Sequence, residues 1–495
     1  MNELKNTWKT HPNLYEINTW PWLTELSEIY NEEIKLDNIP EEIFEKYIKY
    51  FDAVWLMGVW ERSPASKRIA HDHPDLQNEY KKAIDHVKEE EIIGSPYAVY
   101  YYHVDKGLGG KEELNKFRER LNDKNVNLIL DYVPNHIARD HLWTLEKSDM
   151  FIEGTWEDMN NHPDGYFSSY GKVRAHGKDP YFPAWTDTVQ INAFSEDARH
   201  KAIHTLLTIA EICDGVRCDM AMLVTNEIFK KTWGDKVGNP PEKDFWEEII
   251  PRIKNKHRNF KFIAEVYWDM EWKLQQQGFD YTYDEKLYNY IMNESPQSIR
   301  NHITAEWEYN KKSLRYIENH DEQRTVKQMG ILKSKAAAIL ALSLPGMGLV
   351  HEGQMKGYEI KIPVQLKRRT NEMIKNNVLE FYRTLLAIIK DNDIKKNNWE
   401  LCNVTQTSQD DQSNKYIISY HWWNAQEHYL FIINFSENFS NGKIKIPTLN
   451  LTSGKLKFKN LFTDEILRYD ASEIQNNGFK VELASWKYNI FHINS

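Results

Sequence analysis

The stretch ARHKAIHTLLTIAEICDGVRCD, residues 198–219, joins a predicted helix to a predicted strand, and the expected fold class follows from this pairing. Apolar residues recur at three- and four-residue intervals through residues 198–213, which is the spacing of a helix with one buried face. The run GVRCD at residues 215–219 has the length of a buried strand and ends in a carboxylate. A helix that leads into a short apolar strand is typical of parallel sheets with helical crossovers.

The same alternation of short apolar runs and helical segments extends up to about residue 395. Further helical segments are expected at residues 112–121 and 372–389. Eight strands are expected in total, at residues 14–17, 53–58, 126–131, 215–219, 260–265, 279–283, 314–318 and 348–351. Eight strands with helical crossovers predict an α/β fold, a (β/α)8 TIM barrel that spans residues 1–395.

Two segments depart from the barrel pattern. Residues 135–192 are rich in Gly, Pro, Asn, Asp and aromatics and are too long for an ordinary loop, so we expect a small inserted subdomain after strand three, at residues 137–196. After about residue 397 we expect no helices and a C-terminal antiparallel β-sandwich over residues 397–495. Its clearest strands are KYIISYHWW (415–423), HYLFIINF (428–435), GKIKIP (442–447) and WKYNIFHI (486–493).

The net charge of −10 argues against nucleic-acid and anionic-membrane partners, because both require patches of Lys and Arg. The longest apolar run, residues 336–350, is shorter than the roughly 20 residues that cross a bilayer and contains Pro345. The first ten residues lack the features of a secretory signal, so a cytoplasmic location is expected. The three cysteines lack metal-site spacing and are expected to be structural thiols. Composition predicts no oligomeric state.

Five predicted strands end in polar residues, and in a (β/α)8 barrel the chemistry lies at the C-terminal ends of the strands. A single carboxylate at such a position could instead cap a helix or pair with an arginine. Asp219, Glu265 and Asp321 follow strands four, five and seven, so together they are expected to face one cavity. The five segments are LILDYVPNH (128–136), GVRCDMAML (215–223), FIAEVYW (262–268), YIENHDEQR (316–324) and GLVHEGQ (348–354).

These carboxylates suit the cleavage of a glycosidic bond, which needs one carboxylate at the anomeric carbon and one carboxylic acid at the leaving oxygen. Arg217 is two residues before Asp219 on one strand face, so its cation would keep a nucleophile ionised. Glu265 follows an apolar run and precedes aromatic residues, surroundings that would raise its pKa and keep it protonated as an acid. His136 and His320 are candidate donors to sugar hydroxyls.

Four of these blocks resemble the four conserved regions of the α-amylase family, glycoside hydrolase family 13, in the order found in that family. Residues 131–136 resemble the first region, Arg217 and Asp219 the second, Glu265 the third, and His320 with Asp321 the fourth. The resemblance implies that Asp219 is the nucleophile, Glu265 the proton donor and Asp321 the carboxylate that binds sugar hydroxyls and stabilises the transition state. It assigns no subfamily.

A tyrosine before the first region adds to the resemblance. Tyr97, in GSPYAVYYYHVD (94–105), is similar to the family's tyrosine that stacks on the sugar at the cleavage point. Many members carry Lys-His after the nucleophile to hold the leaving-group side of the glucan, but this chain has Met222 and Leu223. The usual contacts on that side are therefore not expected here.

A calcium-associated motif of the family is also altered. Its Asp-Leu-Asn ending is replaced by Gln190, Ile191 and Asn192. Asn135 matches a calcium ligand of the family, but calcium needs six to eight oxygens, which Asp179, Asp187 and nearby carbonyls would have to complete. The sequence thus assigns no certain metal or cofactor, with Asn135 the candidate calcium ligand.

Three further features have two interpretations each. In HGKDPYFPAWTD (176–187), the rings of Tyr181, Phe182 and Trp185 are either sugar platforms or packing residues. The adjacent Trp422 and Trp423 face opposite sides of a strand, so one is expected to pack on the barrel or to bind glucan at the surface. The basic cluster at residues 367–369 is expected to begin a helix and to be a solvated face.

The leading functional prediction is a retaining enzyme that cleaves α-1,4-glucosidic bonds in starch, glycogen or malto-oligosaccharides. The alternative is an α-glucosidase or transglycosylase that acts on small α-glucosides. A third possibility is a non-catalytic binding barrel, which the presence of all three carboxylates disfavours. A retaining mechanism predicts that the Asp219 and Glu265 carboxyl groups lie about 5 to 5.5 Å apart.

Overall fold

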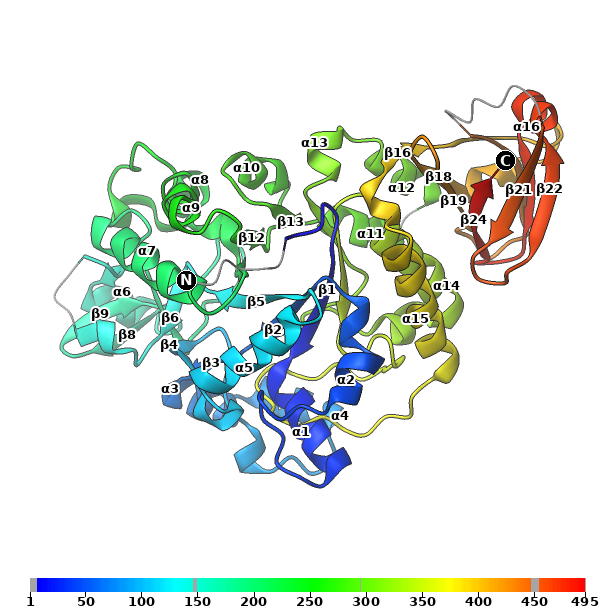
Figure 1. Ribbon diagram of the computed structural model, residues 1–495. Coiled ribbons are helices and arrows are strands. Elements are labelled where there is room, and N and C mark those ends of the chain that lie inside the picture. The colour runs from blue at the N-terminus through cyan, green and yellow to red at the C-terminus, as the bar shows by residue number, and fades with distance from the viewer. Residues whose placement is uncertain (1–6, 146–148, 294, 447–453, 495) are drawn as a thin grey trace. The chain divides into compact units, whose positions relative to one another are not determined.

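The computed structural model describes residues 7–145, 149–293, 295–446 and 454–494 (Figure 1). Eight parallel strands form a closed barrel in the order β1-β15-β14-β13-β12-β11-β5-β2. Their bounds are Asn13–Asn18 (β1), Ala53–Met57 (β2), Asn127–Tyr132 (β5), Gly215–Cys218 (β11), Lys261–Ala264 (β12), Tyr281–Tyr283 (β13), Ser313–Arg315 (β14) and Met347–His351 (β15). The predicted TIM barrel is confirmed, and each of the eight predicted strands overlaps one of these.

The chain divides into two compact units that both contribute strands to the barrel. Of the described residues, the first unit contains those within 7–8, 15–283 and 360–371, and the second contains those within 9–14, 284–359 and 372–494. The predicted domain boundaries 1–395, 137–196 and 397–495 were based on the pattern of helices and strands expected from the sequence, not on compactness. These domain boundaries stay predictions.

Helices follow or precede most barrel strands. In the first unit they are α1 (Thr19–Tyr30), α2 (Glu41–Lys46), α3 (Pro64–Asp72), α4 (Pro74–Ala83), α5 (Lys111–Asn122), α6 (Trp156–Asn161), α7 (Glu196–Ala210), α8 (Asn226–Trp233), α9 (Phe245–Lys256) and α10 (Glu271–Gln276). In the second they are α11 (Glu285–Asn293), α12 (Pro296–Ile303), α13 (Trp307–Asn310), α14 (Thr325–Ser343), α15 (Asn376–Asp391) and α16 (Ala471–Asn477).

The three predicted helices are present, and two of their ends are shifted by about three residues or more. α7 ends at Ala210 rather than at residue 213, because the chain then turns into β11. α15 begins at Asn376 rather than at residue 372. Residues 372–375 instead make hydrogen bonds to the loop at residues 356–359. The Glu372 carboxylate accepts a hydrogen bond from Glu359 N (2.7 Å), and Lys375 N donates to Lys356 O (2.9 Å).

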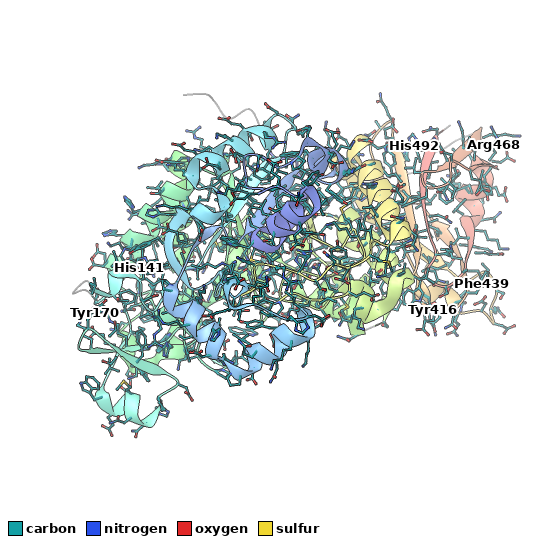
Figure 2. All side chains as sticks on the ribbon, turned by 90° about the horizontal axis from the view of Figure 1, so that it is seen from below. His141, Tyr170, Tyr416, Phe439, Arg468 and His492 are labelled. Carbon is teal, nitrogen blue, oxygen red and sulfur yellow. The ribbon has the colours of Figure 1, made fainter. Side chains whose placement is uncertain are left out.

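Small antiparallel sheets follow β5, as predicted for the insert. One pairs β6 (His136–Ala138) with β10 (Thr188–Gln190), and the other has the order β7-β9-β8, from Glu153–Gly154 (β7), Lys172–Ala175 (β9) and Tyr166–Ser169 (β8). Tyr170 and Gly171 turn the β8–β9 hairpin with positive φ values of 50° and 76°, and Tyr170 is 74% exposed there (Figure 2). A separate hairpin pairs β3 (Trp60–Arg62) with β4 (Val99–Val104).

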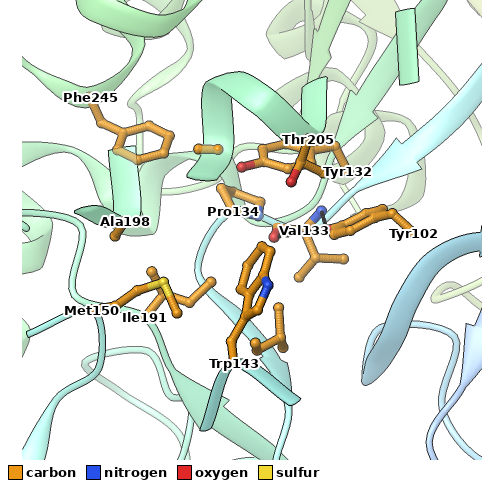
Figure 3. A pocket seen from close by; sticks show the side chains of 12 residues that line it. Tyr102, Tyr132, Val133, Pro134, Trp143, Met150, Ile191, Ala198, Thr205 and Phe245 are labelled. Carbon is orange, nitrogen blue, oxygen red and sulfur yellow. Dashed lines mark hydrogen bonds between the residues drawn. The ribbon is translucent and has the colours of Figure 1, made fainter. Parts of the chain in front are cut away.

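Apolar side chains pack the insert against β5 and α7 in the first unit (Figure 3). Trp143, Met150 and Ile191 from the insert meet Ala198 and Tyr132 around a cavity of about 10 Å³. A space of this size holds at most one water molecule. The insert is therefore closely packed at the C-terminal end of β5.

The C-terminal residues form two antiparallel sheets, ordered β16-β18-β19-β24-β21-β22 and β17-β20-β23. Buried residues of both sheets, including Leu430 and Phe479, share one core, which is the packing of a sandwich. The bounds are Asn398–Leu401 (β16), Asn403–Thr405 (β17), Ile417–Trp423 (β18), His428–Asn434 (β19), Ser440–Lys445 (β20), Lys455–Asn460 (β21), Ile466–Asp470 (β22), Phe479–Leu483 (β23) and Tyr488–Asn494 (β24). All four quoted strands are confirmed, although Pro447 of GKIKIP lies outside the described residues.

Two predictions about local structure are wrong. No helix was expected after residue 397, but α16 connects β22 to β23, and its residues Ala471 and Ile474 belong to the core that the two C-terminal sheets share. Two buried positions are too few to show a helical period in the sequence. The cluster at residues 367–369 begins no helix and is not a solvated face, because Arg368 pairs with Glu91 (2.6 Å) and the buried Arg369 lies 3.8 Å from Glu25.

Two other expectations, on the cysteines and on Trp422, are met in the described part of the chain. The three cysteines are free and buried. Trp422 is fully buried and donates from Nε1 to Ser343 O on α14 (2.8 Å), so it packs on a barrel helix of its own unit. Within the described residues, no helix is long and apolar enough to cross a membrane.

Candidate active site

The ends of β11 and β12 bring two of the predicted carboxylates side by side. The strands pair in parallel with Cys218 opposite Ala264. Asp219 directly follows Cys218, and Glu265 directly follows Ala264. Neighbouring strands lie about 4.8 Å apart, so residues at matching positions are neighbours in space. The register supports the close approach predicted from the sequence.

One guanidinium joins these two carboxylates. Arg217 donates from Nη1 to Asp219 Oδ1 (2.8 Å), and its Nη2 lies 2.8 Å from Glu265 Oε2 as an ion pair. The Arg217 residue is 1% exposed. The predicted pairing with Asp219 is therefore present, and the second contact, to Glu265, was not predicted.

Aromatic rings surround the Arg217 guanidinium. The rings of Trp55, Tyr97 and Tyr283 lie 5.1, 5.2 and 5.7 Å from it, and Arg217 Nε donates to the Tyr283 hydroxyl (3.3 Å). Burial lowers the pKa of Arg217, but the charges of Glu265 and its other neighbours outweigh burial and hold that pKa well above its ordinary value. Arg217 is thus a permanent cation. Of the three rings around it, only Tyr97 was predicted to belong to the site.

Glu265 has more polar surroundings than its sequence neighbours indicate. Its Oε2 accepts a hydrogen bond from Met220 N (2.7 Å), and its Oε1 accepts one from the Tyr267 hydroxyl (3.0 Å). These donors and Arg217 favour the carboxylate, whereas burial favours the acid. Tyr267 was expected to contribute only an apolar ring, so the sequence analysis missed this hydrogen bond.

The backbone after Asp219 is bent to make one of these contacts. Met220 has φ = 41°, a left-handed conformation that is unfavourable for a residue with a side chain. Its amide points at Glu265 Oε2, while Ala221 N donates to Glu265 O (2.9 Å). Such strain persists where surrounding contacts hold it, commonly at functional sites.

Asp131 has a structural role at the end of β5. Its Oδ1 accepts from Trp55 Nε1 (3.0 Å) and its Oδ2 from Gly58 N (2.9 Å), while its carbonyl accepts from Trp60 Nε1 (2.8 Å). Both carboxylate oxygens thus hold β2 and the turn after it.

His136 lies at the start of β6, where the insert begins. It is buried, and its ring is 4.9 Å from that of Trp185. Burial lowers the pKa of His136 to about 4, although the charge of Asp187 opposes this. The imidazole is therefore neutral near pH 7, when it carries one N–H donor and one acceptor.

Asp321 and His320 belong to the second unit, in the loop between β14 and α14. His320 Nε2 lies 3.0 Å from Asp321 Oδ2, with the histidine buried and the aspartate side chain 49% exposed. The Asn319 side chain accepts from Asp321 N (2.9 Å) and Glu322 N (3.0 Å), which fixes the turn. The two residues predicted from the fourth block therefore contact each other.

The aromatic segment of the insert presents two rings to solvent. Tyr181 is 57% and Phe182 67% exposed, and the Asp179 carboxylate accepts from both backbone amides (2.6 and 2.9 Å). The Tyr181 ring meets that of Trp268, three residues after Glu265, at 4.8 Å. Exposure favours the platform interpretation for Tyr181 and Phe182.

The candidate calcium ligands Asn135, Asp179 and Asp187 do not fit that ion. Asn135 Oδ1 accepts a hydrogen bond from the Gln190 side chain (2.9 Å). Asp179 is engaged by the two amides above, and Asp187 Oδ2 accepts from the Ser66 hydroxyl (2.6 Å). These oxygens serve separate donors, so they do not form the oxygen cage that calcium requires.

Comparison with known proteins agrees with the sequence blocks. The family model for the α-amylase catalytic domain matches residues 46–427. The chain is 23% identical to "Alpha-amylase MalA" of Haloarcula japonica over 69% of this chain and 45% of that protein, and 23% identical to "Alpha-amylase 3" of Dictyoglomus thermophilum over 52% and 53%. It thus spans about half the length of each amylase.

Solved structures resemble the whole chain in fold. A noncanonic maltogenic α-amylase, AmyB of Thermotoga neapolitana, matches with a TM-score of 0.67 at 18% identity, over 99% of this chain and 100% of that one. An α-amylase of Geobacillus thermoleovorans, solved with acarbose, also scores 0.67, at 14% identity over 99% and 100%.

Proposed function

Because the chain belongs to the α-amylase family of glycoside hydrolases, we propose that it cleaves α-1,4-glucosidic bonds of starch, glycogen or malto-oligosaccharides with retention of configuration. The observation that carries this proposal is the Arg217 guanidinium, which contacts one oxygen of Asp219 and one of Glu265. A retaining mechanism needs two carboxyl groups about 5 to 5.5 Å apart, and a shared guanidinium supports such a separation.

The two carboxyl groups have different roles in the two steps. Asp219 attacks the anomeric carbon while Glu265 gives its proton to the glycosidic oxygen, so the bond to the leaving sugar breaks and a covalent glycosyl-enzyme forms. Glu265 then takes a proton from water, the water oxygen attacks the anomeric carbon, and the bond to Asp219 breaks. Arg217 keeps Asp219 ionised for the first step.

Other residues bind the sugar in this proposal. Asp321 holds sugar hydroxyls and stabilises the positive charge of the transition state, with His320 as its neighbour. His136 donates to a hydroxyl, and Tyr97 stacks on the sugar at the cleavage point. The substrate is the one partner the reaction requires, and no step calls for a metal or cofactor.

A second function has specific support. Met222 and Leu223 are buried in the 3-10 turn after β11, at the positions of the family's Lys-His pair. No cation holds the leaving sugar from those two positions. Weaker retention of a long leaving group favours an α-glucosidase, or a transglycosylase in which a sugar replaces water in the second step.

The product profile separates these functions. Wild-type protein and Asp219→Asn are incubated with maltoheptaose, glycogen, sucrose and trehalose, and products and their anomeric configuration are followed by NMR. Short α-configured malto-oligosaccharides from wild type alone support the amylase, and longer products or turnover of small glucosides support the alternative. Inverted products would exclude the retaining mechanism, and absence of turnover on every α-glucoside would support a binding protein.

A further inference from the structure

The Gln190 side-chain amide lies at the centre of a buried hydrogen-bond network in the insert. Its Nε2 donates to Asn135 Oδ1 (2.9 Å), Asn135 O (2.9 Å) and Ile191 O (3.0 Å). The Gln190 residue is 0% exposed. One uncharged nitrogen is thus surrounded by three oxygens, an arrangement that otherwise suits a small cation.

The orientation of this amide follows from its partners. Gln190 Oε1 accepts from Lys178 N and from Asn135 Nδ2, both at 3.3 Å. The reversed amide would place an oxygen against three acceptor oxygens, which is repulsive. The donor end of Gln190 therefore faces the three oxygens.

The same hydrogen-bond network includes His136, the candidate sugar-binding histidine. Since Asn135 Oδ1 accepts from Gln190, Asn135 Nδ2 is the donor that faces His136 Nδ1 at 3.3 Å. An acceptor at Nδ1 puts the imidazole hydrogen on Nε2. Gln190 also lies opposite His136 in the β6–β10 ladder, so its amide and its backbone both fix this region.

We propose that the Gln190 amide stands in place of a bridging cation, which makes the insert independent of calcium, and that Gln190 is a positioning residue for His136. It ties Asn135, which follows β5, to Lys178 of the aromatic segment. The part that concerns His136 rests on the proposed function, whereas the part that concerns calcium does not.

The test exchanges the amide for groups of the same shape. Gln190→Met removes the donor, and Gln190→Glu puts an oxygen among the three oxygens. We measure Tm of the full chain in chelator, calcium or magnesium, and kcat and KM separately for maltoheptaose. Gln275→Glu is the control, because Gln275 is also a buried glutamine of the first unit, with Nε2 donating to Thr282 Oγ1 (2.9 Å).

We expect the wild-type Tm to be equal in chelator and in calcium. Gln190→Met lowers Tm by about 3 °C or more in both, and its KM rises more than its kcat falls, because His136 loses its fixed tautomer. Gln190→Glu is the less stable variant in chelator, and calcium raises its Tm whereas magnesium does not. Calcium leaves the Tm of Gln275→Glu unchanged.

Three results would overturn the proposal. These are a wild-type Tm that depends on calcium, a Gln190→Met variant as stable as wild type, and a kcat loss in that variant at constant KM. If Gln190→Glu does not fold, the wild-type and Gln190→Met measurements still decide. If the protein cleaves no glucan, the Tm measurements test the calcium part alone.

Discussion

Replacing Arg217 tests the arrangement on which the proposed mechanism depends. Lysine carries one terminal ammonium, so Arg217→Lys can hold Asp219 or Glu265 but not both in the present geometry. Arg217→Met removes the charge and leaves the two buried carboxyl groups without their shared cation.

The expected loss of kcat/KM follows from the strength of the contacts that Arg217 makes with Asp219 and Glu265. The hydrogen bond from Arg217 Nη1 to Asp219 is 2.8 Å long, and a hydrogen bond to a charged group contributes about 1.5 to 3 kcal/mol. At 1.36 kcal/mol for each factor of ten, loss of one contact lowers kcat/KM by about 10- to 150-fold in Arg217→Lys. In Arg217→Met the ionised form of Asp219 loses the neighbouring cation that favours it. The acidic limb of the pH profile therefore moves to higher pH.

The assay is kcat/KM for an aryl α-maltoside between pH 4 and 9, with Tm measured in parallel. Arg118→Lys is the matched control, because Arg118 is also a buried arginine, paired with Asp214 (2.5 Å) before β11 begins. It should lose stability without a shift of the acidic limb. An unmoved acidic limb in Arg217→Met, or an equal shift in Arg118→Lys, would contradict the proposed role of Arg217.

Tyr267→Phe removes a hydrogen-bond donor to the candidate acid/base, which costs about 0.5 to 1.5 kcal/mol, so kcat/KM should fall about 2- to 13-fold. Because the lost donor favours the ionised carboxyl group, the alkaline limb should move to higher pH, and an alkaline limb at lower pH would contradict this. Gly346→Ala should lower the stability of the protein, because Gly346 has φ = +96° and a Cβ there would clash with the carbonyl oxygen of Ser313. Stability is measured by urea titration, and a midpoint equal to that of the wild type would count against this prediction. Trp422→Phe loses a 2.8 Å hydrogen bond and part of a fully buried ring, so unfolding should become easier by about 1 to 3 kcal/mol in urea titration, with KM for maltotriose unchanged.

The barrel strands were predictable because strand length and apolar character are local properties of the chain. The same holds for the carboxylates, since a residue that ends a strand is visible without knowing its neighbours. The short helix α16 and the start of α15 were not predictable in this way. The first has two buried positions, and the second depends on the contact of Glu372 with a residue 13 positions earlier.

Local patterns in the sequence were enough to predict the barrel, the insert after β5, the C-terminal sheets and the candidate carboxylates Asp219 and Glu265. The folded chain was needed to show that Arg217 contacts both, that Met220 and Tyr267 donate to Glu265, and that Gln190 binds three oxygens. The difference lies in the range of the interactions. Periodicity and strand endings depend on adjacent residues, whereas these hydrogen bonds join atoms whose approach depends on strand register and on how the insert packs.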